Sequence, residues 1–167
     1  LESRAGPEAN EAACASLATL AVGSARNQKA IAKADAVPLL VNLLQHTKLT
    51  IRENAAFAVA MLSDLPDNKV LVADSGGIKP LIELLSIGNP ATQQFAAQAV
   101  ALLTHNNSEN QIAFVQAASP LADLLGSDFP ETQEWAQLAL LRLALNPSNR
   151  AVVVKPVVSV LSGRNTS

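Results

Sequence analysis

The chain has 167 residues, of which 49% are hydrophobic and 16% are charged, and its formal net charge is −2. This balance provides no broad basic face, which argues against nucleic acid or an anionic membrane as the primary partner. No apolar run reaches the roughly 18 residues of a membrane span, and the single cysteine, Cys14, leaves no internal disulfide or thiolate metal cluster. Aliphatic residues and alanine far outnumber the aromatic residues, so we predict an all-α protein.

Repeats with a period near 40 residues organise the chain. Four segments begin with an asparagine, at Asn27, Asn68, Asn110 and Asn149, and the spacings between them are 41, 42 and 39 residues. An alanine-rich block follows each of the first three segments, and a similar block, "NEAACASLATLA", precedes them all. We therefore expect one domain, 1–167, consisting of a partial unit at 7–26, repeats at 27–67, 68–109 and 110–148, and a partial or capping unit at 149–167.

Prolines mark where the alanine-rich helices begin. Pro7, Pro90 and Pro130 occupy equivalent positions in three of the blocks, and Leu49 takes this position in the fourth. Proline is tolerated at the first position of a helix, because the N–H that it lacks would have no partner there. In "GNPATQQFAAQAVALL" we expect Asn89 to cap the helix that Pro90 opens.

Each unit is predicted to contain a short helix, a middle helix and a longer alanine-rich third helix. Gly76 and Gly77 are expected to end a short helix, and Pro80 is expected to open the middle helix that carries "PLIELL". None of these helices could bury its apolar stripe alone, so the units must stack around a continuous core as a solenoid. Small side chains would let successive third helices approach closely, at Ala55, Ala56, Ala96, Ala97 and Ala136.

The two ends depart from the repeat. Residues before Asn27 supply only a third helix, and the last unit keeps its middle helix while losing about three residues of its first, "NRAVVV", and all of its third. Such ends are either caps or the faces of a cut array, and the inner faces exposed by a cut would be sticky. We expect the chain to be a fragment or subdomain of a longer array.

The segment "GGIKPLIELLSIGNPATQQFAAQAVALLT" resembles the armadillo repeat, with its "GAIPPLVELL" turn and helix and its "AAWALSNL"-like third helix. The resemblance extends from Pro7 to about Leu161. HEAT repeats share the period but usually have two helices per unit, whereas the Gly/Pro turn before "PLIELL" favours three. The resemblance implies a right-handed α-solenoid, an armadillo-like superhelix whose third helices line a concave groove for extended peptides or partner helices.

The resemblance does not extend to the importin-type groove, in which each unit carries a Trp and, four residues on, an Asn that clamps the bound peptide backbone. The positions equivalent to the Trp hold Ala15, Phe57, Gln98 and Leu138. The positions equivalent to the Asn hold Thr19, Met61, Leu102 and Arg142. Because no unit has both residues, we do not expect a receptor for basic nuclear-localisation peptides.

Nine candidate groove residues remain when the residue one turn earlier on the same helical face is added to each pair. They are Asn54, Phe57 and Met61, then Phe95, Gln98 and Leu102, then Trp135, Leu138 and Arg142. This surface suits the buried face of an amphipathic helix or a hydrophobic strip of another protein. Phe57, Phe95 and Trp135 are the expected anchors. The alternative is that these aromatic residues are ordinary core residues between neighbouring helices.

Other chemistry finds little support in the sequence. His46 and His105 fall in expected loops, with no cysteine or carboxylate at ligand spacing, so we expect no metal site. Cys14 lies in the tightly packed part of its helix, where an inert buried thiol is expected. The chain has no glycine-rich phosphate loop, nucleophile elbow or His/Asp/Ser constellation, so we expect neither an enzyme nor a cofactor.

These observations predict a non-catalytic protein–protein interaction scaffold that binds a peptide or amphipathic helix of a partner in its concave groove. One alternative is the substrate-recruiting armadillo region of a larger ubiquitin ligase. Another is a structural subunit of a cytoskeletal or organellar assembly. We expect a monomer or a subunit of a larger complex, in the cytoplasm or nucleus, with an organelle as the alternative location.

Overall fold

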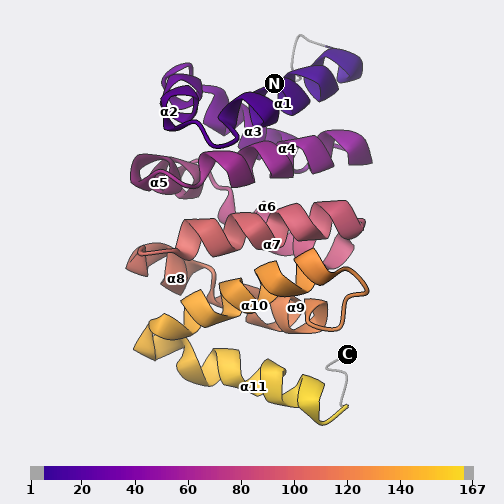
Figure 1. The fold of residues 1–167 in the computed structure, drawn as a ribbon, viewed down its shortest axis with the longest axis vertical. Helices are drawn as coiled ribbons and strands as arrows, with labels where there is room; N and C mark the ends of the chain where they lie inside the picture. Colours follow the sequence, from indigo (N-terminus) through magenta and orange to yellow (C-terminus); the bar gives the residue numbers. More distant parts are fainter. Residues whose placement is uncertain (1–5, 164–167) are drawn as a thin grey trace.

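The computed structural model describes residues 6–163, which form a stack of helices without a β-strand (Figure 1). The α-helices in this range are α1 Pro7–Ala21, α2 Ala25–Lys33, α3 Ala36–Leu43, α4 Leu49–Leu62, α5 Pro66–Asp74, α6 Ile78–Ile87, α7 Pro90–Thr104, α8 Ser108–Ala113, α9 Ala118–Leu124, α10 Pro130–Leu145 and α11 Arg150–Leu161. Two 3₁₀ turns, η1 Val115–Ala117 and η2 Pro147–Asn149, precede α9 and α11. The predicted all-α solenoid is therefore confirmed.

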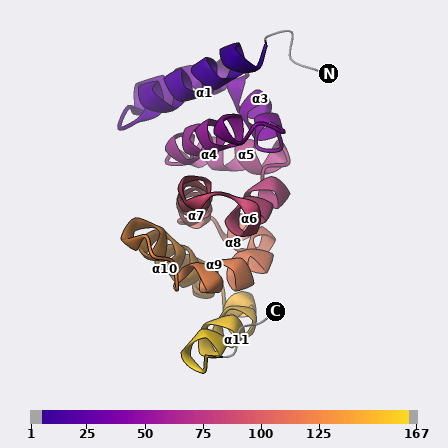
Figure 2. The ribbon, with the colours of Figure 1, turned by 90° about the vertical axis from the view of Figure 1, so that its right-hand side faces the viewer.

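The third helices form one layer and the middle helices form another. Helices α1, α4, α7 and α10 pack against one another in that order, and α3, α6 and α9 each pack against the third helix of their own unit. Figure 2 shows the third helices on one side of the stack and the middle helices on the other. Each layer alone would leave an apolar face in water, so the core lies between them and runs the length of the stack.

The third helices begin where the sequence predicts. Pro7, Leu49, Pro90 and Pro130 are each the first residue of their helix. The side chain of Asn89 accepts a hydrogen bond from the backbone N–H of Thr92 at 2.8 Å, which confirms the predicted cap.

Alanines form the contact between successive third helices. The five predicted close-contact alanines have no exposed surface: Ala55, Ala56, Ala96, Ala97 and Ala136. Their small side chains permit the long helices α4, α7 and α10 to approach, as expected. Larger aliphatic residues at the ends of these helices, Leu62, Leu103 and Leu143, fill the space beside them.

The repeat asparagines close the preceding third helices, a role that their position at the start of each segment did not reveal. The side-chain NH₂ of Asn27 donates to the carbonyl of Leu20 at 2.8 Å, and that of Asn110 donates to the carbonyl of Leu103 at 3.0 Å. Asn68 and Asn149 make the same bond to Leu62 and Leu143. Each asparagine thus satisfies a carbonyl that the end of an α-helix leaves without a partner.

Polar contacts between units join only neighbours. Asn110 also donates to the carbonyl of Lys69, and Asn149 donates to the carbonyl of Gln111. Within residues 6–163, the side-chain hydrogen bonds that leave a unit connect residues 36 to 43 positions apart, which is about one period. No such bond in this range spans two units.

Two predicted helix starts require correction. Pro80 does not open α6, because the helix begins at Ile78 and Pro80 is its third residue. The first four N–H groups of a helix have no intrahelical partner, so a proline costs no hydrogen bond at the third position either. Gly76 does end the preceding short helix, and its φ of 82° lies in the left-handed region that favours glycine.

The second correction concerns the last unit. The first helix, "NRAVVV", and the middle helix were expected to be separate, but α11 runs without a break from Arg150 to Leu161, with Pro156 inside it. No glycine or turn residue stands between the two segments, so the helix continues through the proline. Pro156 forgoes the hydrogen bond that the carbonyl of Val152 would accept, and Val152 is exposed to water.

Candidate functional site

The nine candidate residues lie on three successive third helices. Asn54, Phe57 and Met61 come from α4, and the other two sets come from α7 and α10, which follow it in the same layer (Figures 1 and 2). All nine side chains are half-buried. We call this set the third-helix face. Its residues are neither sealed in the core nor free in solvent, which is the exposure that a binding surface on packed helices requires.

Phe57 and Phe95 meet across the boundary between two units. Their ring centroids are 4.7 Å apart and the ring planes differ by 27°, which is a stacked arrangement. Both rings also pack against the buried core. The pair therefore contributes to the contact between α4 and α7, while the exposed part of each ring stays available to a partner.

The α10 part of the face combines an aromatic ring with a charge. Trp135 and Leu138 pack against the core with part of their surface exposed. One turn further on, Nη1 of Arg142 donates to the carbonyl of Ala101 in α7 at 2.5 Å. Burial lowers the pKa of Arg142, and the nearby carboxylate of Asp64 opposes this shift. Arg142 thus joins two third helices and leaves other guanidinium donors for a partner.

A second cation, which the sequence analysis missed, lies close to Arg142. Lys69 in α5 is only 6% exposed, and its Nζ donates to the carbonyl of His105 at 2.7 Å. Burial, and then repulsion from Arg142, lower the pKa of Lys69. The pKa of His105 is also lowered, mainly by burial and to a smaller extent by repulsion from Arg142 and Lys69. Both cations bind carbonyls at the C-terminal end of α7, the negative end of its dipole.

The sequence did contain a signal for Lys69. It follows the repeat Asn68 directly, as Gln28 and Gln111 follow Asn27 and Asn110. These two glutamines are also buried, and each donates to a carbonyl at the end of the preceding third helix. In these three units the residue after the repeat asparagine is therefore a buried donor, and in one of them it carries a charge. Arg150, which follows Asn149, is exposed, although it also donates to a carbonyl near the end of a third helix, that of Ala144.

The polar members of the face differ in their contacts. Asn54 donates to the backbone carbonyl of Glu11 in α1 at 3.5 Å, so it joins two helices. Glu11 in turn forms an ion pair with Lys48, at 2.6 Å. No carboxylate is among the nine residues of the face, and within residues 6–163 neither Lys69 nor Arg142 forms an ion pair. Because two cations, Arg142 and Lys69, stand against the one nearby carboxylate of Asp64, the end of the face near Arg142 has a net positive charge.

The other candidate residues lie apart from this face. His46 and His105 are in loops after α3 and α7, as expected, and the described part of the chain contains no group of three or more potential metal ligands. None of the described helices is long and apolar enough to cross a bilayer.

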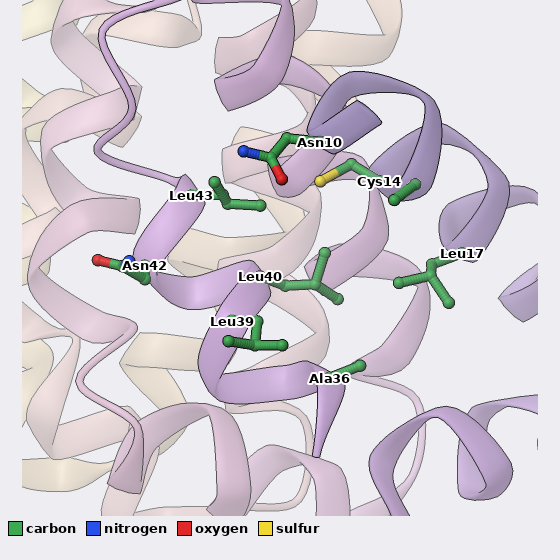
Figure 3. A pocket seen from close by; sticks show the side chains of 9 residues that line it. Asn10, Cys14, Leu17, Ala36, Leu39, Leu40, Asn42 and Leu43 are labelled. Carbon is green, nitrogen blue, oxygen red and sulfur yellow. The ribbon is translucent and has the colours of Figure 1, made fainter. Parts of the chain in front are cut away.

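Cys14 lines an apolar cavity of about 180 Å³ between α1 and α3 (Figure 3). The other lining residues are Asn10, Ala13, Leu17, Ala36, Leu39, Leu40, Asn42 and Leu43. Only 1% of Cys14 is exposed, and burial raises the pKa of its thiol to about 11. At neutral pH the group is a thiol rather than a nucleophilic thiolate, in agreement with the expected inert role.

The chain is similar to armadillo-repeat proteins in sequence. A family model for the Armadillo/beta-catenin-like repeat matches residues 24–62 and 66–105. Importin subunit alpha-1b of Oryza sativa subsp. japonica is 33% identical over 81 residues, which are 48% of this chain and 15% of that protein.

Solved structures share the fold. An engineered protein superposes with a TM-score of 0.88 and 32% identity, over 100% of this chain and 42% of its own. A second engineered protein gives a TM-score of 0.85 and 31% identity, over 92% of this chain and 64% of its own. A designed armadillo repeat protein in complex with the peptide (KR)4 superposes with a TM-score of 0.82 and 22% identity, over 90% of this chain and 66% of its own. The chain spans less than two thirds of each of these relatives.

Proposed function

Because this chain is an armadillo-repeat protein, we propose that it is a non-catalytic scaffold whose third-helix face binds a peptide or amphipathic helix of a partner protein. The observation that carries the proposal is the row of half-buried aromatic and aliphatic side chains on α4, α7 and α10, which no described helix covers. A partner would gain binding energy by removing these side chains from water.

The chemistry of the face favours a particular partner segment. Phe57, Phe95 and Trp135 offer apolar surface along the row, and each anchor that a partner buries contributes about 2 kcal/mol or more. Arg142 and Lys69 make one end positive, so a carboxylate of the partner would be favoured there. We therefore propose an amphipathic segment with an apolar stripe and an acidic residue near the α10 end.

This partner differs from that of a designed protein of the same fold, which is solved with the alternating Lys-Arg peptide (KR)4. A peptide of that kind would be repelled by Arg142 and Lys69, and it would find no carboxylate among the nine residues of the face. The proposal also includes a cytoplasmic or nuclear location, which similarity to an importin subunit supports. Imaging of a fluorescent fusion tests the location separately.

Selection from a random displayed peptide library against the immobilised chain tests the binding proposal. We expect the selected peptides to share apolar residues at helical spacing and a carboxylate. Their affinities would then be measured by fluorescence anisotropy for wild type, Phe57→Ala and Trp135→Ala. Loss of one anchor, about 2 kcal/mol, weakens binding by roughly 30-fold. The peptide (KR)4 serves as a probe that should not bind.

Phe129→Ala is the matched control, because Phe129 is an exposed aromatic residue outside the face, directly before α10. It should leave the affinity within about twofold, while circular dichroism shows that all three variants remain helical. The proposal is wrong if Phe57→Ala and Trp135→Ala bind the selected peptides as tightly as the wild type does.

A further inference from the structure

Helix α10 carries opposite charges at the two ends of its part of the third-helix face. Glu131, Trp135, Leu138 and Arg142 follow one another at steps of four, three and four residues, which places them on one helical face. At a rise of about 1.5 Å per residue, the 11 positions from Glu131 to Arg142 span about 16 Å of the helix axis. The apolar side chains thus lie between a carboxylate and a guanidinium group.

The position of Glu131 stays open to water inside a longer stack. Glu131 is the second residue of its third helix, and the equivalent residues are Thr50 in α4 and Ala91 in α7. Thr50 is exposed and Ala91 is half-buried, although α4 and α7 each have a third helix on both sides. A further third helix beside α10 would therefore leave Glu131 accessible. Within residues 6–163, Glu131 is exposed and forms no ion pair.

The opposite charge comes from Arg142 together with Lys69, against the one nearby carboxylate of Asp64. Each cation donates a hydrogen bond to a carbonyl at the end of α7, and each has further N–H groups. Because burial weakens the screening by water and salt, these charges attract a carboxylate more strongly than fully exposed cations would.

The two charges favour a helix over an extended peptide as the bound segment. The anchors Phe57, Phe95 and Trp135 come from three successive third helices, so a segment that contacts all of them runs across α4, α7 and α10. Its side chains must reach the apolar row beneath it and a charge on each side. The side chains of an extended strand point in only two opposite directions, whereas a helix points side chains to all sides and is about 10 to 12 Å wide. A helix therefore meets all three requirements at once.

On the basis of the binding function proposed above, we infer that the partner segment is an amphipathic α-helix whose apolar stripe covers the three aromatic anchors. Its flank beside Glu131 is basic, and its flank beside Arg142 and Lys69 is acidic. Turning such a helix end for end keeps the apolar stripe on the face but exchanges the two flanks. The opposite charges therefore fix the direction in which the helix binds.

Two designed peptides of about 18 residues test this direction. As helices they are about 27 Å long, enough to cross three helices that pack about 8 to 10 Å apart. Both peptides have the same leucine stripe, with lysines on one flank and glutamates on the other, and the second peptide exchanges the flanks.

A nitroxide at one terminus of the peptide broadens the NMR signals of the protein groups near it. The indole N–H of Trp135, the only tryptophan in the chain, reports on the α10 end of the face. We expect a nitroxide at the N-terminus to broaden this signal with one of the two peptides. With the other peptide, the signal should broaden only when the nitroxide is at the C-terminus.

Glu131→Lys tests the acidic side of the face. The variant replaces an attraction with a repulsion, so both peptides should bind about three- to tenfold more weakly. Asp123→Lys is the matched control, because Asp123 is an exposed carboxylate of α9, in the layer of middle helices. It should leave the affinity within about twofold. If Glu131 served only to stabilise the start of α10, its substitution would lower the Tm without changing the affinity.

Three results would overturn this inference. Broadening of the Trp135 signal from the same terminus of both peptides would show that the charges do not set the direction. Equal affinities of the Glu131→Lys and Asp123→Lys variants would exclude a contact with Glu131. Carbon chemical shifts typical of an extended backbone in the bound peptide would exclude a helix. In each case, weaker binding to Phe57→Ala would still support the proposed binding function, whereas failure of both peptides to bind the wild type would contradict that function as well.

Discussion

Asn110 offers the sharpest test of how the units are held together. Its side-chain NH₂ donates both to the carbonyl of Leu103, at the end of α7, and to the carbonyl of Lys69 in the preceding unit, at 3.0 and 3.4 Å. The residue is 3% exposed, so water cannot replace these bonds without opening the stack. Asn110→Ala should therefore leave the carbonyl of Leu103 without a partner and remove a second hydrogen bond from the carbonyl of Lys69, which keeps its helical bond inside α5.

The expected loss can be set from the structure. The carbonyl of Leu103, buried without a partner, costs about 1 to 3 kcal/mol, and the lost second bond to the carbonyl of Lys69 costs about 1 kcal/mol, so Asn110→Ala should cost about 2 to 4 kcal/mol. Asn27 donates the same helix-closing bond to Leu20, but there the bond is exposed. Water can replace the amide at that position, and Asn27→Ala should cost about 0.5 to 1 kcal/mol. The two variants thus compare the same bond at two depths.

Urea unfolding followed by far-ultraviolet circular dichroism measures the difference. A loss of about 3 kcal/mol should also lower the Tm of a chain of this size by roughly 6 to 12 °C. The m-value must be reported for each variant, because a solenoid can lose one unit before the others and a smaller m-value would reveal this.

Asn110→Asp separates the hydrogen bonds from the volume of the side chain. It keeps the shape of asparagine but replaces the NH₂ donor with an acceptor that faces two carbonyl oxygens. The loss of stability should be at least as large as for Asn110→Ala. Equal losses for the Asn110→Ala and Asn27→Ala variants, or a wild-type stability for Asn110→Asp, would refute this reasoning.

Two further predictions concern the thiol and a tight turn. Because burial raises the pKa of Cys14 to about 11, the thiol of the folded chain should react with a thiol reagent at pH 8 only as fast as the fold opens around it. Full reaction in urea provides the control. Rapid reaction without denaturant would contradict the buried position. Gly88→Ala should destabilise the fold by about 1 to 3 kcal/mol, since its Cβ would lie 2.7 Å from the carbonyl of Leu84, whereas Gly126→Ala, with 3.5 Å to its nearest neighbour, should be almost neutral. Equal unfolding midpoints for the two glycine variants would show that the turn at Gly88 relaxes freely.

The sequence predicts much of the fold because each helix start depends on local chemistry. Pro90 begins its helix and Asn89 caps it, and both effects act within a few residues. The continuous helix through Pro156 was missed because the shortened first helix was assigned the same break as its longer counterparts. A proline signals a helix start only when turn residues precede it.

The candidate site was less accessible to sequence reasoning. Helical spacing places Phe57 and Phe95 on matching faces of their own helices, but their stacking depends on how α4 and α7 are rotated and offset against each other. The approach of Lys69 to the end of α7 likewise depends on contacts between units. Periodicity within one helix carries neither kind of information. The binding role of the nine face residues stays a prediction.

The one-period reach of the polar contacts has a consequence for the size of such chains. Outside their own unit, Asn110 and Asn149 bind only the unit before it, so no side-chain hydrogen bond in the described range depends on the total number of units. A duplicated copy of residues 68–109, inserted after residue 109, would meet residues 110–148 on one side, as the original does now, and the original copy on the other side. Gene rearrangements that add or remove a whole period would therefore preserve a folded product, and the extent of the binding surface could change in steps of one unit.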